Sequence, residues 1–134
     1  MEEVKGKIFF SIRGDSFSID EVSANLSLTP MRFFNKGDIF SEEPFYMQAR
    51  ETFWSYCVEI EDLACIDNYY NILLDKIEFS RLSLITLKEK YDLEFTFKIF
   101  IFECKSYSNL FISNRLINFA SAINATIESN YIKI

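Results

Sequence analysis

The stretch LEFTFKIFIFE, residues 93–103, decides the fold class of this chain. Its residues alternate between two faces, and one face is uniformly apolar, ending on Ile99 and Ile101. The other face begins polar and becomes apolar at Phe100 and Phe102. A strand that is apolar on both faces at one end is typical of the interior of a sheet. We therefore expect a long strand here, inside the sheet and away from an open edge.

Outward from this stretch, two hydrophobic periods predict the other elements. Alternation predicts further strands at 7–13, 31–34, 53–60 and 126–133. Apolar residues at three- and four-residue steps predict helices at 19–27, at 63–79, around 84–91 and around 116–123. Ser18 and Ser113 are the expected N-caps of the first and last helices. Residues 39–52 show no clear period and contain Pro44, so we expect a loop there.

This order of elements predicts an α+β fold, with a mainly antiparallel sheet covered on one face by helices. The 134 residues suit a single domain spanning 1–134. A ferredoxin-like sandwich is the closest architecture. The segments that open the first and last helices, 17–22 and 111–116, resemble each other. Two related β-α-β halves are therefore an alternative description of the same fold.

The composition removes several classes of function. The chain has no His, which excludes His-based acid–base catalysis, the Ser-His-Asp triad and His-ligated metal sites. The net charge of -6 disfavours electrostatic binding to nucleic acid or to an anionic membrane. We expect no catalytic residue, no cofactor and no metal.

The acidity belongs to one segment, residues 38–78, which holds ten acidic residues against Arg50 and Lys76. A surface of this kind would attract a basic partner and raise its association rate. The simpler interpretation is solubility, because a net charge far from zero prevents self-association.

The expected loop at 39–52 combines acidic and aromatic residues, which is the composition of a protein-binding hot spot. The partner-binding candidates in and beside it are Glu42, Glu43, Phe45, Tyr46 and Glu51. The alternative is a loop that folds its aromatic residues back over the sheet.

A second set of candidates surrounds the turn Lys36-Gly37-Asp38. Lys36 and Asp38 could present paired charges to a small molecule beside Trp54, in a pocket between the sheet and the helices. The structural interpretation is a tight turn in which Gly37 takes a positive φ and Asp38 bonds backbone amides. Trp54 lies on the apolar face of its expected strand, which favours a place in the core.

The cysteines and the carboxylates give no established site. The three cysteines form no C-x-x-C pattern, and their odd number predicts free thiols in a reducing compartment. Cys57 could be reactive, but no His is present to act as its base. Glu59, Glu61 and Asp62 lie at the start of an expected helix, where acidic residues stabilise the dipole. The acidic start and the short apolar runs predict a cytoplasmic protein without a membrane segment.

Taken together, several of these segments resemble the bacterial family called domain of unknown function 4279. The matching residues run in order along nearly the whole chain: Phe10, Gly14, Phe17, Val22, Leu26, Leu28, Thr29-Pro30, Lys36-Gly37-Asp38, Trp54, Leu73, Leu87, Tyr91, Phe111-Ile112-Ser113, Phe119-Ala120 and Asn130-Tyr131. The most specific piece is the Lys-Gly-Asp turn followed by Trp54. The resemblance implies a small α+β domain and offers no reaction, although members of such small families occur as immunity proteins beside bacterial toxins.

Two functions follow as hypotheses. The first is a non-catalytic protein-binding module, in its most concrete form an immunity or antitoxin-like protein that covers a basic toxin domain with an acidic surface. The second is a small-molecule-binding regulatory domain with its pocket near Trp54 and Lys36. The sequence names neither the partner nor the oligomeric state.

Overall fold

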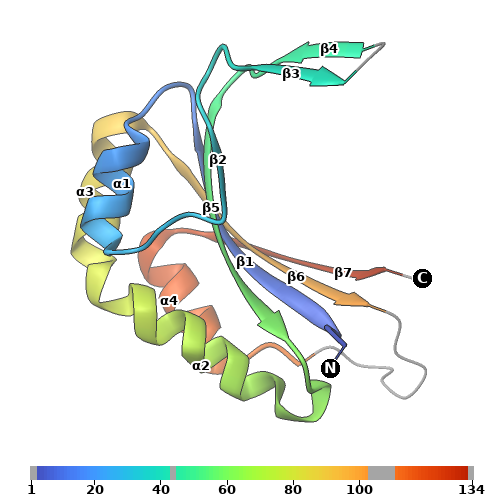
Figure 1. Cartoon of the computed structure of the whole chain (residues 1–134). Coiled ribbons are helices and arrows are strands. Elements are labelled where there is room, and N and C mark those ends of the chain that lie inside the picture. Colours follow the sequence, from blue (N-terminus) through green and yellow to red (C-terminus); the bar gives the residue numbers. More distant parts are fainter. Residues whose placement is uncertain (1–2, 43–44, 103–110, 133–134) are drawn as a thin grey trace.

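The computed structural model describes residues 3–42, 45–102 and 111–132, which form two layers (Figure 1). One layer is a five-stranded sheet in the order β2-β5-β1-β6-β7. The other layer consists of α1 to α4, which lie together against one face of the sheet (Figure 1). The expected α+β class, with mainly antiparallel pairing and helices on one face, is confirmed.

The interior position of the expected strand is also confirmed for Glu94–Phe102, and Glu103 lies outside the described residues. The strands of the sheet are β1 (Gly6–Gly14), β2 (Arg32–Phe34), β5 (Thr52–Ile60), β6 (Glu94–Phe102) and β7 (Thr126–Ile132). β1 pairs antiparallel with both β5 and β6, whereas β7 pairs parallel with β6. β6 is therefore flanked by a paired strand on each edge, and an interior position of this kind suits a strand with two apolar faces.

The helices begin and end close to the expected residues. They are α1 (Ile19–Leu26), α2 (Ile66–Ile77), α3 (Arg81–Tyr91) and α4 (Asn114–Ile123). Short 3-10 turns precede and follow α2, η1 at Leu63–Cys65 and η2 at Glu78–Ser80, so the expected helix at 63–79 is three consecutive helical segments.

Both expected serine caps are present. The Ser18 hydroxyl accepts a hydrogen bond from the Glu21 amide, and the Ser113 hydroxyl accepts one from the Leu116 amide, each at 3.1 Å. α1 and α4 also end alike, on Ser27 and Asn124 in the left-handed region. The strands around them also agree in direction: β1 and β2, on either side of α1 in the chain, both pair antiparallel with β5 and so run parallel to each other, and β6 and β7, on either side of α4, pair parallel.

The core lies between the sheet and the helices. Alternate side chains of β1, β5 and β6 face the helical layer and are buried, except for the partly buried Tyr56. Phe10 lies at the centre, in contact with the rings of Trp54, Phe95 and Phe97. Burying one such side chain contributes about 1.5–3 kcal/mol. Tyr70 of α2 donates its hydroxyl hydrogen to the Phe111 carbonyl at 2.6 Å, and burial raises its pKa.

The expectation of a loop at 39–52 is wrong. The chain forms a second, two-stranded sheet there, with β3 (Ile39–Glu42) paired antiparallel with β4 (Phe45–Gln48). We call it the hairpin. It projects beyond the five-stranded sheet, on the side away from the helices (Figure 1). Its strands are too short to show a period in the sequence, and they depend on contacts with β2 described below.

Candidate functional site

The hairpin is fixed at its base by the turn at 36–38. The amide of Gly37 donates to the Ala49 carbonyl and the amide of Ala49 donates to the Asp38 carbonyl, each at 2.8 Å. Beyond these bonds, Phe40 packs edge-on against Phe34 of β2, with ring centroids 5.1 Å apart. The hairpin is thus tied to the main sheet by backbone bonds and by one aromatic contact.

The turn itself has the predicted structural form. Gly37 has a φ of 94°, a conformation that side chains rarely adopt. The Asp38 carboxylate accepts a hydrogen bond from the Asn35 amide at 2.7 Å. The Lys36 ammonium lies 2.6 Å from the Asp15 carboxylate, so both candidate charges of this turn have structural partners.

Trp54 does not join Lys36 and Asp38 in one site. Its side chain faces the helical layer with 0% exposure, and its indole N–H donates to the Ser23 hydroxyl at 3.0 Å. Lys36 lies at the surface beside Asp15. The indole therefore acts as a core residue, and no surface of it is available to a ligand.

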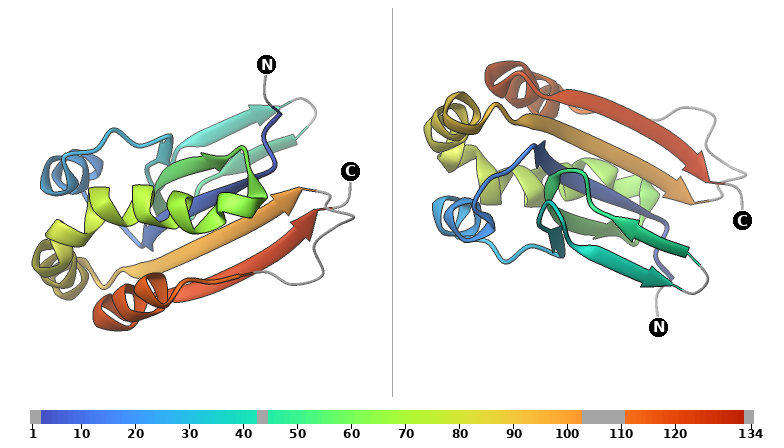
Figure 2. Two further views of the ribbon diagram at one scale, coloured as in Figure 1. Left: turned by 90° about the horizontal axis from the view of Figure 1, so that it is seen from below. Right: turned by 90° about the horizontal axis from the view of Figure 1, so that it is seen from above.

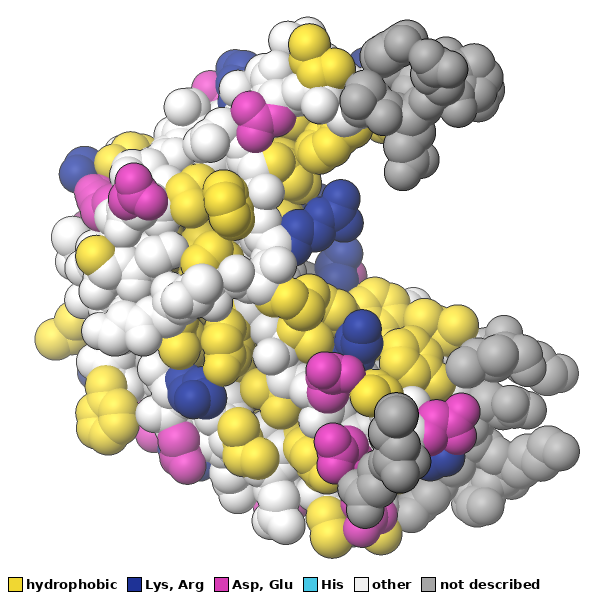
Figure 3. Space-filling view, viewed as in Figure 1, with side chains coloured by type: hydrophobic (Ala, Val, Ile, Leu, Met, Phe, Trp, Pro, Cys, Tyr) yellow, Lys and Arg dark blue, Asp and Glu magenta, His cyan; other side chains and the backbone are white. Residues whose placement is uncertain are grey.

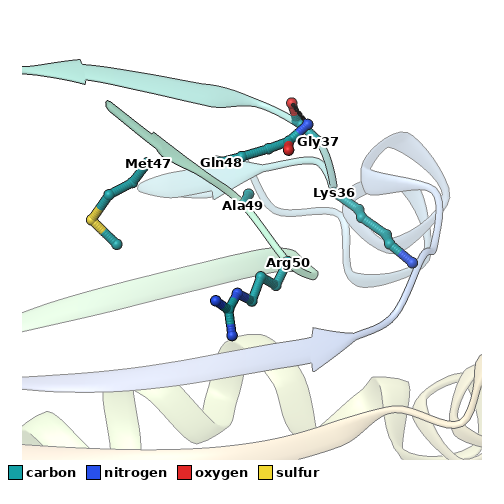
Figure 4. Close-up of a pocket in the computed structure, with 6 residues that line it drawn as sticks. All are labelled: Lys36, Gly37, Met47, Gln48, Ala49 and Arg50. Atoms are coloured by element: carbon teal, nitrogen blue, oxygen red, sulfur yellow. Dashed lines mark hydrogen bonds between the residues drawn. The ribbon is translucent and has the colours of Figure 1, made fainter. Parts of the chain in front are cut away.

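A hollow lies next to the turn, beneath the hairpin. It has a volume of about 600 Å³ and is lined by Lys36, Gly37, Met47, Gln48, Ala49 and Arg50. Figure 4 shows the side chains of Met47 and Arg50 extending to the same side of the hairpin. In the space-filling view, Lys and Arg atoms lie in the depth of the concave region between the hairpin and the far end of the sheet, with hydrophobic atoms around them (Figure 3).

The floor of this concave region is the sheet face opposite to the helices, which we call the open face. Alternation places Phe53 on it, stacked on Phe34 at 5.1 Å, and Arg32 lies over the Phe34 ring. Small polar residues form its centre, where the hydroxyls of Ser11 and Ser55 lie 3.3 Å apart. The alternation of β1 and β5 predicted these side chains, but nothing in the sequence indicated that a hairpin would stand over them.

The hairpin carries apolar side chains that the main sheet does not cover. Ile39 is 69% exposed and Met47 is 68% exposed. Phe40, opposite Met47 in the ladder, is 37% exposed in spite of its contact with Phe34. Met47 is opposite Phe40 and Ile39 is opposite Gln48, so the two most exposed side chains lie on opposite faces of the hairpin. Exposed apolar side chains on a projecting element are typical of an interaction surface.

The partner-binding candidates have different positions. Glu42 belongs to β3 and Phe45 and Tyr46 to β4, and the side chains of all three lie outside the described part of the structure. Glu43 also lies outside the described residues. Glu51 follows the hairpin and lies 3.8 Å from Arg13 of β1.

The acidic segment at 38–78 does not form one surface. Its first part belongs to the turn and the hairpin, on the side of the open face, and its last part belongs to α2, within the helical layer (Figure 1). On α2, Asp75 binds Arg115 at 2.8 Å, and Glu78 of η2 binds the same guanidinium at 3.0 Å. Only the first part is available to a partner that docks on the hairpin.

One of the carboxylates near the end of β5, Asp62, has a structural role. The Asp62 side chain accepts a hydrogen bond from the Ala64 amide at 3.0 Å and caps η1. Within the described residues, no group of three or more carboxylates and thiols is arranged to hold a metal ion.

Cys57 and Cys65 are free thiols, as predicted, and Cys104 lies outside the described residues. Cys57 points to the open face, and burial raises the pKa of its thiol to about 11. The pKa of the exposed Cys65 is raised by the hydrogen bond that its thiol donates to Asp62.

We expect Cys57 to be alkylated slowly in the folded protein. With a pKa near 11, the thiolate fraction of Cys57 at pH 8 is roughly a hundredfold lower than that of an ordinary cysteine. The rate should rise about tenfold for each pH unit between 8 and 10. Mass spectrometry after timed iodoacetamide labelling measures it, and unfolding in urea should abolish the difference between Cys57 and Cys65. Fast labelling of Cys57 at pH 8 in the folded state would contradict the assigned burial.

In the part of the chain that the structure describes, no helix is long and apolar enough to cross a membrane. No curated protein and no solved structure matches the chain. Residues 2–132 match the family described as "Domain of unknown function (DUF4279)". This match covers nearly the whole chain, as did the residues of the resemblance, and the chain therefore belongs to the DUF4279 family.

Proposed function

We propose that this protein is a non-catalytic protein-binding module that holds its partner with the hairpin. The observation that carries the proposal is the exposure of Ile39 and Met47, 69% and 68%, on an element that stands apart from the main sheet. When a partner removes exposed apolar side chains from water, the free energy of the system falls, which favours binding. Interfaces also favour Met and aromatic residues in their centre, and the hairpin sequence contains Phe40, Phe45 and Tyr46.

The more specific proposal is an immunity-type protein that neutralises a basic toxin domain. Glu42 and Glu43 are consecutive in the sequence of the hairpin, and the chain has a net charge of -6. Acidic residues that follow exposed apolar ones in the sequence would steer a basic partner to this element and disfavour acidic ones. The acidic residues of α2 take no part, since they lie in the helical layer.

The test uses the product of the gene next to this one in the source genome, produced as a purified protein, and measures its affinity by calorimetry. We expect Ile39→Ser/Met47→Ser to weaken binding at least roughly tenfold, because buried apolar anchors carry most of the energy of an interface. The matched control is Phe79→Ser/Leu82→Ser, which makes the same kind of change at positions 94% and 71% exposed on the helical side. Equal losses in the two variants, or no loss in either, would contradict the proposal.

A second pair of variants tests the charge. Glu42→Lys/Glu43→Lys should weaken binding and flatten its dependence on salt. The exposed Asp67 and Glu89 of the helical layer provide the control, because Asp67→Lys/Glu89→Lys changes the net charge by the same amount. An equal effect of both pairs would show that only the total charge matters. Protection from the partner's toxicity in a growth assay should follow the same order as the affinities.

The alternative, a small-molecule-binding regulatory domain, is supported by the hollow beneath the hairpin. Its lining includes Lys36 and Arg50, whose positive charges suit an anionic ligand. The candidate pocket is therefore this hollow and not the expected pocket beside Trp54. The variants separate the two proposals. The affinity for a ligand in the hollow would depend on Arg50 and would not change in Glu42→Lys/Glu43→Lys.

A further inference from the structure

β7 is an edge strand whose outer side is open in the described part of the chain. It pairs with β6 on one side, and it is the last strand in the order of the sheet. Six of its seven residues are exposed, Ile127 being the exception. An edge of this length presents a row of unpaired N–H and C=O groups, to which another strand can add.

The sequence of β7 lacks the features that usually protect an edge. It contains no Pro, Gly or Lys, and its one charged residue, Glu128, lies 3.7 Å from Lys98 of the neighbouring strand. Tyr131 and Ile132 are 52% and 40% exposed. The opposite edge of the sheet, β2, has only three residues and offers a much shorter ladder. The long, unprotected edge is therefore β7.

The strand is complementary to itself in one register. When two copies of an edge pair antiparallel, backbone groups point outward only at alternate residues, so the two-fold axis must pass through a residue position. With the axis at Ser129, all seven residues of β7 pair with residues of the second copy. The opposed residues are then Thr126 and Ile132, Ile127 and Tyr131, and Glu128 and Asn130, with Ser129 opposite itself.

Other registers are worse. An axis at Glu128 would place two like charges directly opposite each other and would leave Tyr131 and Ile132 without partners, and like charges in that position destabilise a sheet. An axis at Asn130 would leave Thr126 and Ile127 unpaired. The register at Ser129 therefore combines the longest ladder with no repulsion between opposed residues.

We propose that two copies of this chain associate through β7, with the two-fold axis at Ser129, and join their sheets into one. Ile127 and Tyr131 pair with the buried Phe97 and Ile101 of β6, so they face the helical layer and would form an apolar cross-strand pair there. α4 is the helix nearest to this edge (Figure 2). Its Ile117 is 45% exposed, which adds apolar surface on the same side. Both hairpins remain free, since they lie beside β2 and β5.

The first experiment is a cross-link that only this register allows. In a chain carrying Cys57→Ala, Cys65→Ser and Cys104→Ser, we expect Ser129→Cys to form a disulfide-linked dimer on mild oxidation, because residue 129 faces its own copy. Asn130→Cys is the matched control and should stay uncross-linked, since it faces residue 128. Mixing Asn130→Cys with Glu128→Cys chains should restore cross-linking between the two.

The second experiment needs no cysteine and measures the dissociation constant by analytical ultracentrifugation. Ser129→Lys and Ser129→Glu should each weaken the dimer, by roughly two- to fivefold, because each places like charges opposite each other. An equimolar mixture of the two should dimerise more strongly than either alone. Phe33→Lys on β2, also an exposed edge position, should leave the constant unchanged.

Two outcomes would overturn the proposal. One is a wild-type protein that sediments as a monomer at every concentration. The other is a dimer that neither cross-links at position 129 nor responds to charges there, which would place the contact elsewhere on the molecule. Circular dichroism of each variant confirms that the fold is retained.

Discussion

Trp54→Ala should lower the free energy of unfolding by roughly 3–5 kcal/mol, because it removes the largest fully enclosed side chain and leaves a cavity. The indole contacts the Phe10 ring at a centroid distance of 6.4 Å, and its N–H bonds the Ser23 hydroxyl of α1. The loss therefore affects the contact between β5, β1 and the first helix together. Urea denaturation followed by circular dichroism measures it, since the variant lacks the only tryptophan.

Two further variants divide this effect into its parts. Trp54→Phe keeps a ring in the core but leaves the Ser23 hydroxyl without its donor, and it should cost less than the alanine variant. Phe79→Ala removes a ring that is 94% exposed and should change stability by no more than about 0.5 kcal/mol. A loss in Trp54→Ala as small as that of Phe79→Ala would show that the indole is not enclosed.

The elements that the sequence predicted well are those with a long and uniform period. β6 spans nine residues of alternation, and α2 carries its apolar stripe over three turns. Ser18 and Ser113 could be assigned as caps because the first amides of a helix have no partner within the helix, and a nearby serine hydroxyl can accept a hydrogen bond from one of them. This chemistry is local. Local rules therefore located the elements to within a few residues.

The hairpin could not be predicted, because its cause is not local. Each of its strands has four residues, which is too short for a period to stand out, and Pro44 between them suggests a break. The strands are held by bonds between the turn at 36–38 and Ala49 and by the packing of Phe40 on Phe34. The two ends of this segment come together where β2 and β5 pair, with Phe34 opposite Phe53.

The candidate site shows the same limit. The acidic residues at 38–78 are close in sequence, and a single acidic surface was a natural hypothesis. β5 then carries the chain from the end of the sheet near the hairpin to the opposite end, where the chain turns into α2 on the helical side (Figure 1). The place of Trp54 in the core followed from alternation alone, whereas nothing in the sequence indicated that Lys36 would lie at the surface beside Asp15.

Gly6→Ala should destabilise the protein by about 1–3 kcal/mol, for a reason that lies in the backbone. Gly6 pairs with Ile60 of β5 and with Ile101 of β6, so it lies between two strands. A Cβ atom at Gly6 would come within 2.5 Å of the Phe100 carbonyl oxygen. That oxygen belongs to the main chain of β6 and cannot rotate away, so the ladder between β1 and β6 must separate locally.

Gly14, at the other end of β1, provides the matched control. A Cβ atom there would meet the Leu93 side chain at 2.6 Å, and a terminal methyl group can move to another rotamer. Gly14→Ala should therefore cost less than Gly6→Ala in the same urea denaturation experiment. Hydrogen exchange should show faster exchange of the β6 amides near Phe100 in Gly6→Ala alone, because only that variant forces two backbones apart. If the two variants lose the same stability, or if exchange near Phe100 does not change, the close approach of β1 and β6 is not what requires a glycine at this position.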